Sequence, residues 1–176
     1  MDNILFFDIE VYQYNSFVIF KNIDKEFVAC FTNDDRFEGV GEFIKGYMDN
    51  GYTLCGFNNY SYDDFILEAM IAGWNGKQIK VLNDEIIGAW SNKFAKKRYP
   101  KGLFKSIDVF QQIDVGMPSL KKIEGNMGRK ILETSVGFDI DRPLTILELQ
   151  AEKDYCSYDI DNTIDVYKIR IKSYFQ

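Results

Sequence analysis

Histidine is the most informative absence from this sequence, since none occurs among its 176 residues. This excludes Ser-His-Asp and Cys-His catalysis, histidine general bases, HExxH zinc sites and Cys/His zinc fingers. Cysteine is scarce, and the three present (Cys30, Cys55 and Cys156) are widely spaced among apolar or aromatic residues. We therefore expect reduced core cysteines in a cytosolic protein, without structural zinc. Any chemistry must use carboxylates, tyrosines, lysines, arginines and oxygen-liganded metal ions.

Long apolar runs and an excess of positive charge are also absent. No run approaches the roughly 20 residues of a membrane span, and the amino terminus lacks the features of a secretory signal. We expect a cytoplasmic protein with no membrane partner. The net charge of −6 argues against a general polyanion binder. It does not exclude a nucleic-acid enzyme whose acids are offset by metal ions.

The remaining composition, 46% hydrophobic and 16% aromatic, predicts one globular domain over residues 1–176. We expect strands at 4–10, 16–21 and 26–31, close enough in sequence to form an antiparallel meander. Further strands are expected at 52–57 and 104–110. Helices are expected at 37–48, 61–72 and 119–127, from a capping box at Thr145 and Glu148, and at 152–174. Residues 74–104 have no clear periodicity, which predicts an irregular insertion or a small hairpin. The pattern indicates an α/β fold whose mixed sheet contains the meander and is flanked by helices.

Two acids stand out in the first predicted strand. Asp8 interrupts an apolar run, and burying a carboxylate there is unfavourable unless something compensates its charge. Asp8 and Glu10 share one face of the strand, about 6.5 Å apart along the backbone. The pair suits hard divalent cations; the alternative is a strand that simply ends in acids.

Two later segments contain acids that are likewise either functional or ordinary. Asp63 falls in the first turn of a predicted helix, where it is either a functional acid or an ordinary first-turn acid, and the neighbouring Asp64 makes their orientations ambiguous. Tyr155 and Asp159 lie four residues apart on one helical face beside the apolar stripe. They either face a cleft or belong to a solvated acidic face with Asp154, Asp161 and Asp165.

Three motifs together resemble those of the 3′→5′ proofreading exonucleases with four acids and a tyrosine (DEDD type, tyrosine subtype). They are Phe7-Asp8-Ile9-Glu10, Asn59-x-x-Tyr62-Asp63 and Tyr155-x-x-x-Asp159, in the family's order and rough separation. The chain is particularly similar to the exonuclease domain of family B DNA polymerases of the protein-primed phage type. Ser119-Leu120-Lys121-Lys122-Ile123 resembles their Ser/Thr-Leu-x-x-apolar motif, which holds single-stranded DNA, and Arg142-Pro143 precedes the third motif as in those enzymes.

The resemblance implies a ribonuclease H-like fold and a metal-dependent enzyme that removes nucleoside monophosphates from the 3′ end of single-stranded or frayed DNA. Two Mg²⁺ or Mn²⁺ ions are implied. Asp8, Glu10 and Asp159 would hold one ion, and Asp8 would bridge to the second, which Asp63 supports through water. Tyr155 would orient the attacking water.

DNA contacts and partners follow from the same resemblance. Asn59, Tyr60 and Tyr62 are candidate contacts to the strand, with the aromatic rings stacking on bases. The other candidates are Ser119, Leu120, Lys121 and Lys122. A DNA polymerase, in cis or in trans, is the implied partner, and the likeness points to a phage or prophage gene. No polymerase motif occurs, which leaves a free-standing enzyme or a proofreading domain separated from its polymerase.

The sequence departs from the family's pattern at one position, and it contains one feature outside the three motifs. Glu133 stands where the phage enzymes have a catalytic-site lysine, which leaves Lys121, Lys122 and Lys130 as alternatives. Residues 93–105 form a basic segment that either steers the DNA backbone or is a solvated loop. Its cations are Lys93, Lys96, Lys97, Arg98, Lys101 and Lys105, and it contains no acid.

Two rival functions remain open. A ribonuclease of the same fold would carry the same motifs. A non-catalytic module that binds a polymerase or DNA would not need all four acids and the tyrosine, which are present here.

Overall fold

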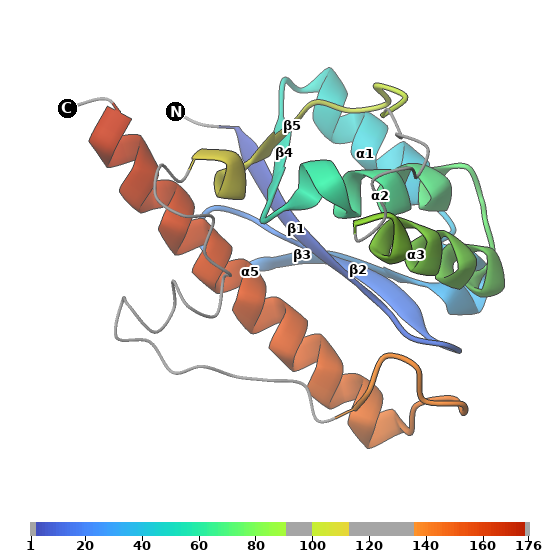
Figure 1. The fold of residues 1–176 in the computed structure, drawn as a ribbon. Helices are drawn as coiled ribbons and strands as arrows, with labels where there is room; N and C mark the ends of the chain where they lie inside the picture. Colours follow the sequence, from blue (N-terminus) through green and yellow to red (C-terminus); the bar gives the residue numbers. More distant parts are fainter. Residues whose placement is uncertain (1–2, 91–99, 113–135, 175–176) are drawn as a thin grey trace.

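Five strands form one mixed sheet in the order β3-β2-β1-β4-β5 (Figure 1). The structure is a computed structural model that describes residues 3–90, 100–112 and 136–174. The strands are β1 (Ile4–Val11), β2 (Ser16–Lys21), β3 (Phe27–Thr32), β4 (Thr53–Gly56) and β5 (Ser106–Asp108). The first three pair antiparallel, which confirms the predicted meander, whereas β4 runs parallel to both β1 and β5. The predicted α/β fold with a mixed sheet is confirmed.

Helices cover both faces of this sheet. Figure 1 shows α1 (Val40–Asp49), α2 (Asp63–Ile71) and α3 (Gly76–Trp90) on one face and α5 (Ile146–Tyr174) along the other. Short 3₁₀ turns follow β3, β4 and β5 as η1 (Asn33–Asp35), η2 (Asn59–Ser61) and η3 (Val109–Gln112). Within the described ranges, no helix combines the length and apolarity needed to cross a membrane.

The alternation of side chains along β1 assigns each residue to one of two cores. Leu5, Phe7 and Ile9 pack with the α1–α3 layer, whereas Phe6 packs with α5. Because side chains two residues apart share a face, Asp8 and Glu10 follow Phe6 onto the α5 face. The two acids therefore lie between the sheet and the longest helix.

The start of α5 confirms the capping box. The Glu148 N–H donates to Thr145 Oγ1 (3.1 Å), and the Thr145 N–H donates to Glu148 Oε1 (3.0 Å). From there the helix continues without interruption to Tyr174. The two separate helical stretches that we expected are one helix, because no residue between 148 and 152 breaks it.

The prediction of an irregular segment or hairpin at 74–104 is wrong for residues 76–90, which form α3. Ile79, Leu82 and Ile86 enter the same core as β1 and α2. Residues 91–99 lie outside the described ranges, as does the helix expected at 119–127. The strand expected at 104–110 is shorter, with β5 limited to Ser106–Asp108.

Candidate metal and active site

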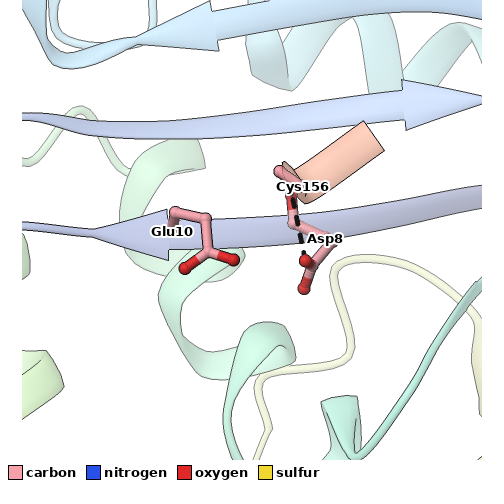
Figure 2. A group of neighbouring side chains, drawn as sticks. All are labelled: Asp8, Glu10 and Cys156. Atoms are coloured by element: carbon pink, nitrogen blue, oxygen red, sulfur yellow. Dashed lines mark hydrogen bonds between the residues drawn. The ribbon is translucent and has the colours of Figure 1, made fainter. Parts of the chain in front are cut away.

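Asp8, Glu10 and Cys156 form the centre of the candidate site. One ligand atom from each lies within 4.8 Å of those of the other two (Figure 2). The Cys156 thiol, buried on α5, lies 3.6 Å from Asp8 Oδ2. Both carboxylates are half-buried on β1. The site therefore forms where α5 packs across the carboxyl-terminal half of β1.

Asp63 reaches this centre because β4 is short. The parallel pairing of β1 with β4 extends from Ile4 only to Phe6, so β1 continues beyond its neighbour. After β4 the chain turns through η2 into α2, and Asp63 Oδ1 accepts a hydrogen bond from the Ile9 N–H (3.2 Å). The buried Asp63 carboxylate thus occupies the open edge of β1 beside the two strand acids.

Asp64 has a different role, which removes the ambiguity left by the sequence. Its Oδ1 accepts from Asn59 Nδ2 (3.0 Å) and its Oδ2 from the Ser106 hydroxyl (2.6 Å). These bonds fasten the loop after β4 to β5. Burial raises the pKa of Asp64 to about 6 despite these bonds. Asp63 is therefore the acid of this pair that belongs to the site.

The acids of α5 also divide into two groups. The pKa of Glu10 is raised by burial, then by Asp8 and then by Asp159, so Asp159 belongs to the group that acts on the site. Asp161 and Asp165 instead form ion pairs with Lys21 (2.6 Å) and Lys25 (2.9 Å), which fasten α5 to the β2–β3 hairpin. The alternative of a solvated acidic face therefore does not describe Asp161 and Asp165, whereas it does describe Asp154, which is exposed and accepts a hydrogen bond from Gln150 (2.9 Å). Tyr155 is half-buried on α5, directly before Cys156.

The four predicted acids share one electrostatic environment. The pKa of Glu10 is raised well above its usual value by burial and then by the charges of Asp8, Asp159, Asp63 and Glu152. The pKa of Asp63 is likewise raised, chiefly by burial and then by Asp8 and Asp64. These pKa shifts express an excess of buried negative charge, which divalent cations would relieve.

The donor chemistry of the site fits hard cations. Burial and the charges of Asp8, Glu10 and Asp159 raise the pKa of Cys156 well above its usual value. The thiol therefore remains protonated and donates to Asp8. The remaining donors are carboxylate oxygens, the ligands that Mg²⁺ and Mn²⁺ prefer.

Glu152 is a further acid near the site that the sequence reasoning missed. It is buried, and its Oε2 accepts a hydrogen bond from the Tyr12 hydroxyl (2.7 Å). Its Oε1 has no hydrogen-bond partner among the described residues. The signal for Glu152 was its spacing, four residues before Cys156 and seven before Asp159, which places all three on one helical face.

Asp108, at the end of β5, was also missed. It is buried and accepts hydrogen bonds from the backbone N–H groups of Asn58 (2.8 Å), Tyr60 (3.1 Å) and Phe110 (2.9 Å). This carboxylate organises the loop between β4 and α2, which carries the second motif. The available signal was a carboxylate inside the strand predicted at 104–110, since a buried carboxylate needs hydrogen-bond partners.

The predicted DNA contacts are placed differently from one another. Asn59 is fully buried and its amide is directed at Asp64, whereas the Tyr60 ring is 44% exposed. Tyr62 is half-buried, and its hydroxyl donates to Asn83 Oδ1. The other predicted contacts lie outside the described ranges: Ser119, Leu120, Lys121, Lys122, and residues 93–99 of the basic segment. Lys130 and Glu133, which concern the family's catalytic-site lysine, also lie outside them. Lys101 and Lys105 of the basic segment are exposed.

Comparison with models of known protein families gives no match, and comparison with curated proteins gives no significant similarity. The likeness to proofreading exonucleases therefore depends on the three motifs and on where the fold places their residues.

Proposed function

We propose that this protein is a metal-dependent 3′→5′ exonuclease that removes nucleoside monophosphates from single-stranded or frayed DNA. The supporting observation is that Asp8, Glu10, Asp63 and Asp159 come from three distant segments and yet meet. The ligand atoms of Asp8 and Glu10 lie together, Asp63 bonds to the Ile9 N–H between them, and Asp159 adds to the raised pKa of Glu10 after burial and Asp8. They are also the four acids of the three motifs. A non-catalytic module would have no reason to retain this unfavourable concentration of charge.

The ribonuclease H-like fold is part of this proposal. The resemblance implies a mixed sheet with an antiparallel meander, and the observed sheet has both features. Asp8 and Glu10 lie in the carboxyl-terminal half of β1, and Asp63 bonds to the stretch of β1 that extends beyond its parallel neighbour β4. The ends of parallel strands are a common location for ligand sites in α/β proteins.

The residues of the chain have separate tasks in this proposal. Asp8, Glu10, Asp63 and Asp159 would hold Mg²⁺ or Mn²⁺, and the Ile9 N–H keeps Asp63 in position. Bound divalent ions activate water and stabilise the charge that develops on the attacking and leaving oxygens. Tyr155 would orient the water by hydrogen bonding, as the resemblance implies. The direction of digestion, the DNA substrate and a polymerase partner also come from the resemblance.

The test is digestion of matched 5′-labelled DNA and RNA oligonucleotides with Mg²⁺, Mn²⁺ or a chelator. We expect a descending ladder from single-stranded DNA that requires the metal. A ladder from RNA but not DNA would support the ribonuclease alternative. Absence of cleavage with either metal would contradict the proposal and support a binding module.

A further inference from the structure

Glu152 on α5 is a buried acid that does not belong to the proposed set of metal ligands. The residue is 1% exposed, and its Oε2 accepts a hydrogen bond from the Tyr12 hydroxyl (2.7 Å). Its Oε1 is closed to bulk solvent and has no hydrogen-bond partner among the described residues. A buried carboxylate oxygen without a partner is destabilising, so its presence calls for a physical reason.

The fold places this carboxylate beside Glu10. Asp8, Glu10 and Tyr12 follow one another at every second position, on the face of the sheet that α5 covers. Tyr12 contacts Glu152, and Asp8 contacts Cys156 one helical turn further along α5. Glu10 lies between these two contacts, and its ligand atom is within 4.8 Å of that of Cys156 (Figure 2). Glu152 therefore lies at the Tyr12 end of the acidic site.

The charge of Glu152 reaches the site. The pKa of Glu10 is raised by burial, then by Asp8, Asp159 and Asp63, and then by Glu152. Ionised carboxylates only accept hydrogen bonds, so Glu10 and Glu152 do not satisfy each other. A cation or a hydrogen-bond donor close to both would relieve them.

Fastening α5 to β1 does not account for this charge. The Tyr12 hydroxyl needs one acceptor, and a neutral amide would supply it at a lower cost of burial than a carboxylate. Asp161 and Asp165, which also fasten α5, are each paired with a lysine. In the part of the chain that the structure describes, no lysine or arginine forms such an ion pair with Glu152.

We propose that Glu152 supports the metal site from outside the set of ligands, with Oε1 accepting a hydrogen bond from water carried by the cation that Glu10 holds. The inference rests on the metal site of the proposed function and not on the reaction. Mg²⁺ keeps several of its waters when a protein binds it, and residues that hydrogen-bond to the groups around a metal raise its affinity. Tyr12 holds the carboxylate through Oε2, which leaves Oε1 for this bond.

Binding of Mn²⁺, followed by the electron paramagnetic resonance signal of the free ion, measures this role without a substrate. Glu152→Gln keeps an acceptor for Tyr12 but removes the charge, and it should weaken Mn²⁺ binding about 10- to 100-fold. Asp154→Asn removes one charge from an exposed position two residues away and is the matched control, with an unchanged Kd. Equal Kd values for the wild type and Glu152→Gln, or equal weakening in both variants, would overturn the inference.

Thermal unfolding separates this role from one of fastening alone. Because the amide relieves negative charge beside Glu10, Glu152→Gln should be at least as stable as the wild type without added metal. Mn²⁺ should then raise the Tm of this variant less than that of the wild type. A lower Tm without metal, together with an unchanged Kd for Mn²⁺, would show that Glu152 only fastens α5 to β1.

Digestion of 5′-labelled DNA by the same proteins separates the inference from the proposed function. Metal-dependent digestion with a Mn²⁺ Kd that does not depend on Glu152 overturns the inference alone. A Kd that depends on Glu152 without digestion supports the role of Glu152 and overturns the exonuclease function. Absence of Mn²⁺ binding by the wild type would overturn both.

Discussion

Asp63 and Asp64 are neighbours in the chain, but their carboxylates serve different parts of the molecule. Asp63 accepts from the Ile9 N–H beside the strand acids, whereas Asp64 accepts from Asn59 and Ser106. Both are buried. The sequence placed both in one helical turn, and only the short β4 and the position of β5 determine which one faces the site.

The two residues should respond differently to the same substitution. Asp63→Asn should lower metal-dependent DNA digestion about 10- to 100-fold, the usual effect of removing a group that supports bound metal. Asp64→Asn, the matched control, keeps a hydrogen-bonding side chain and should retain most of the activity. Initial rates with Mg²⁺ measure both. A larger loss in Asp64→Asn would reverse the assignment.

Asp64 should also affect the pH dependence of stability. Its pKa is raised to about 6 in the folded protein from an ordinary value of 3.8, so the folded state binds this proton more tightly. The resulting stability is present below about pH 3.8 and is lost as pH rises through about 6. At about 1.36 kcal/mol per pKa unit, the loss is up to about 3 kcal/mol.

Urea unfolding of the wild type and Asp64→Asn between pH 4 and 7 measures this effect. The difference in the free energy of unfolding should shift in favour of the variant as pH rises. A difference that stays constant with pH would contradict the pKa shift of Asp64.

At the scale of elements, α5 delivers one side of the site. It packs along β1 in the opposite sense, so Tyr12 contacts Glu152, Asp8 contacts Cys156 and Phe6 contacts Tyr167. The capping box fixes where this helix begins. The position of Asp159 therefore depends on the whole length of α5.

Removing the cap should destabilise the protein without changing the site. Thr145→Ala deletes one of the two reciprocal hydrogen bonds of the box and should reduce the free energy of unfolding by about 1 kcal/mol. Asn75→Ala is the matched variant, since it likewise deletes one of the two reciprocal hydrogen bonds between Asn75 and Gln78 at the start of α3 (2.9 Å in both directions). Thermal unfolding measures both losses. No loss in either variant would show that these boxes do not stabilise their helices.

The sequence predicted some elements better than others for a physical reason. The meander strands and the start of α5 have clean periodicity or a capping box, and both were confirmed. In α3 the buried Ile79 and Ile86 are mixed with exposed Val81, Ile87 and Trp90, which hides the helical period. The box of Asn75 and Gln78 was the missed signal. Ile87 and Trp90 line a pocket beside Glu10, so two of the residues that obscured the helix lie next to the candidate site.

For the whole molecule, the sheet order and the packing of α5 together explain why three motifs far apart in sequence meet. The first two motifs lie on or after the neighbouring strands β1 and β4, and α5 brings the third across β1. The motif acids could be selected from the sequence because each interrupts or adjoins an apolar element. For Glu152 and Cys156 the sequence offered only a helical face shared with Asp159, since their relation to Glu10 and Asp8 depends on how α5 packs across β1. The pocket beside Glu10 depends likewise on the placement of α3.

The concentration of acids predicts how metal ions affect the whole protein. Because the pKa values of Glu10 and Asp63 are raised, the metal-free protein loses stability as pH rises and these groups ionise. Mg²⁺ or Mn²⁺ should therefore raise the Tm, and more at pH 8 than at pH 5, where protons compete with the ions. Thermal unfolding with and without metal measures this. A shift independent of pH, or equally large in Asp8→Asn, would place the ions elsewhere.

The most direct test of the account is the release of nucleotides from 5′-labelled single-stranded DNA by the wild type and by Asp8→Ala, with Mg²⁺. We expect a descending ladder for the wild type and none for Asp8→Ala, whose circular dichroism should match that of the wild type. Equal digestion by both folded proteins would contradict the assignment of the acid cluster as the catalytic site.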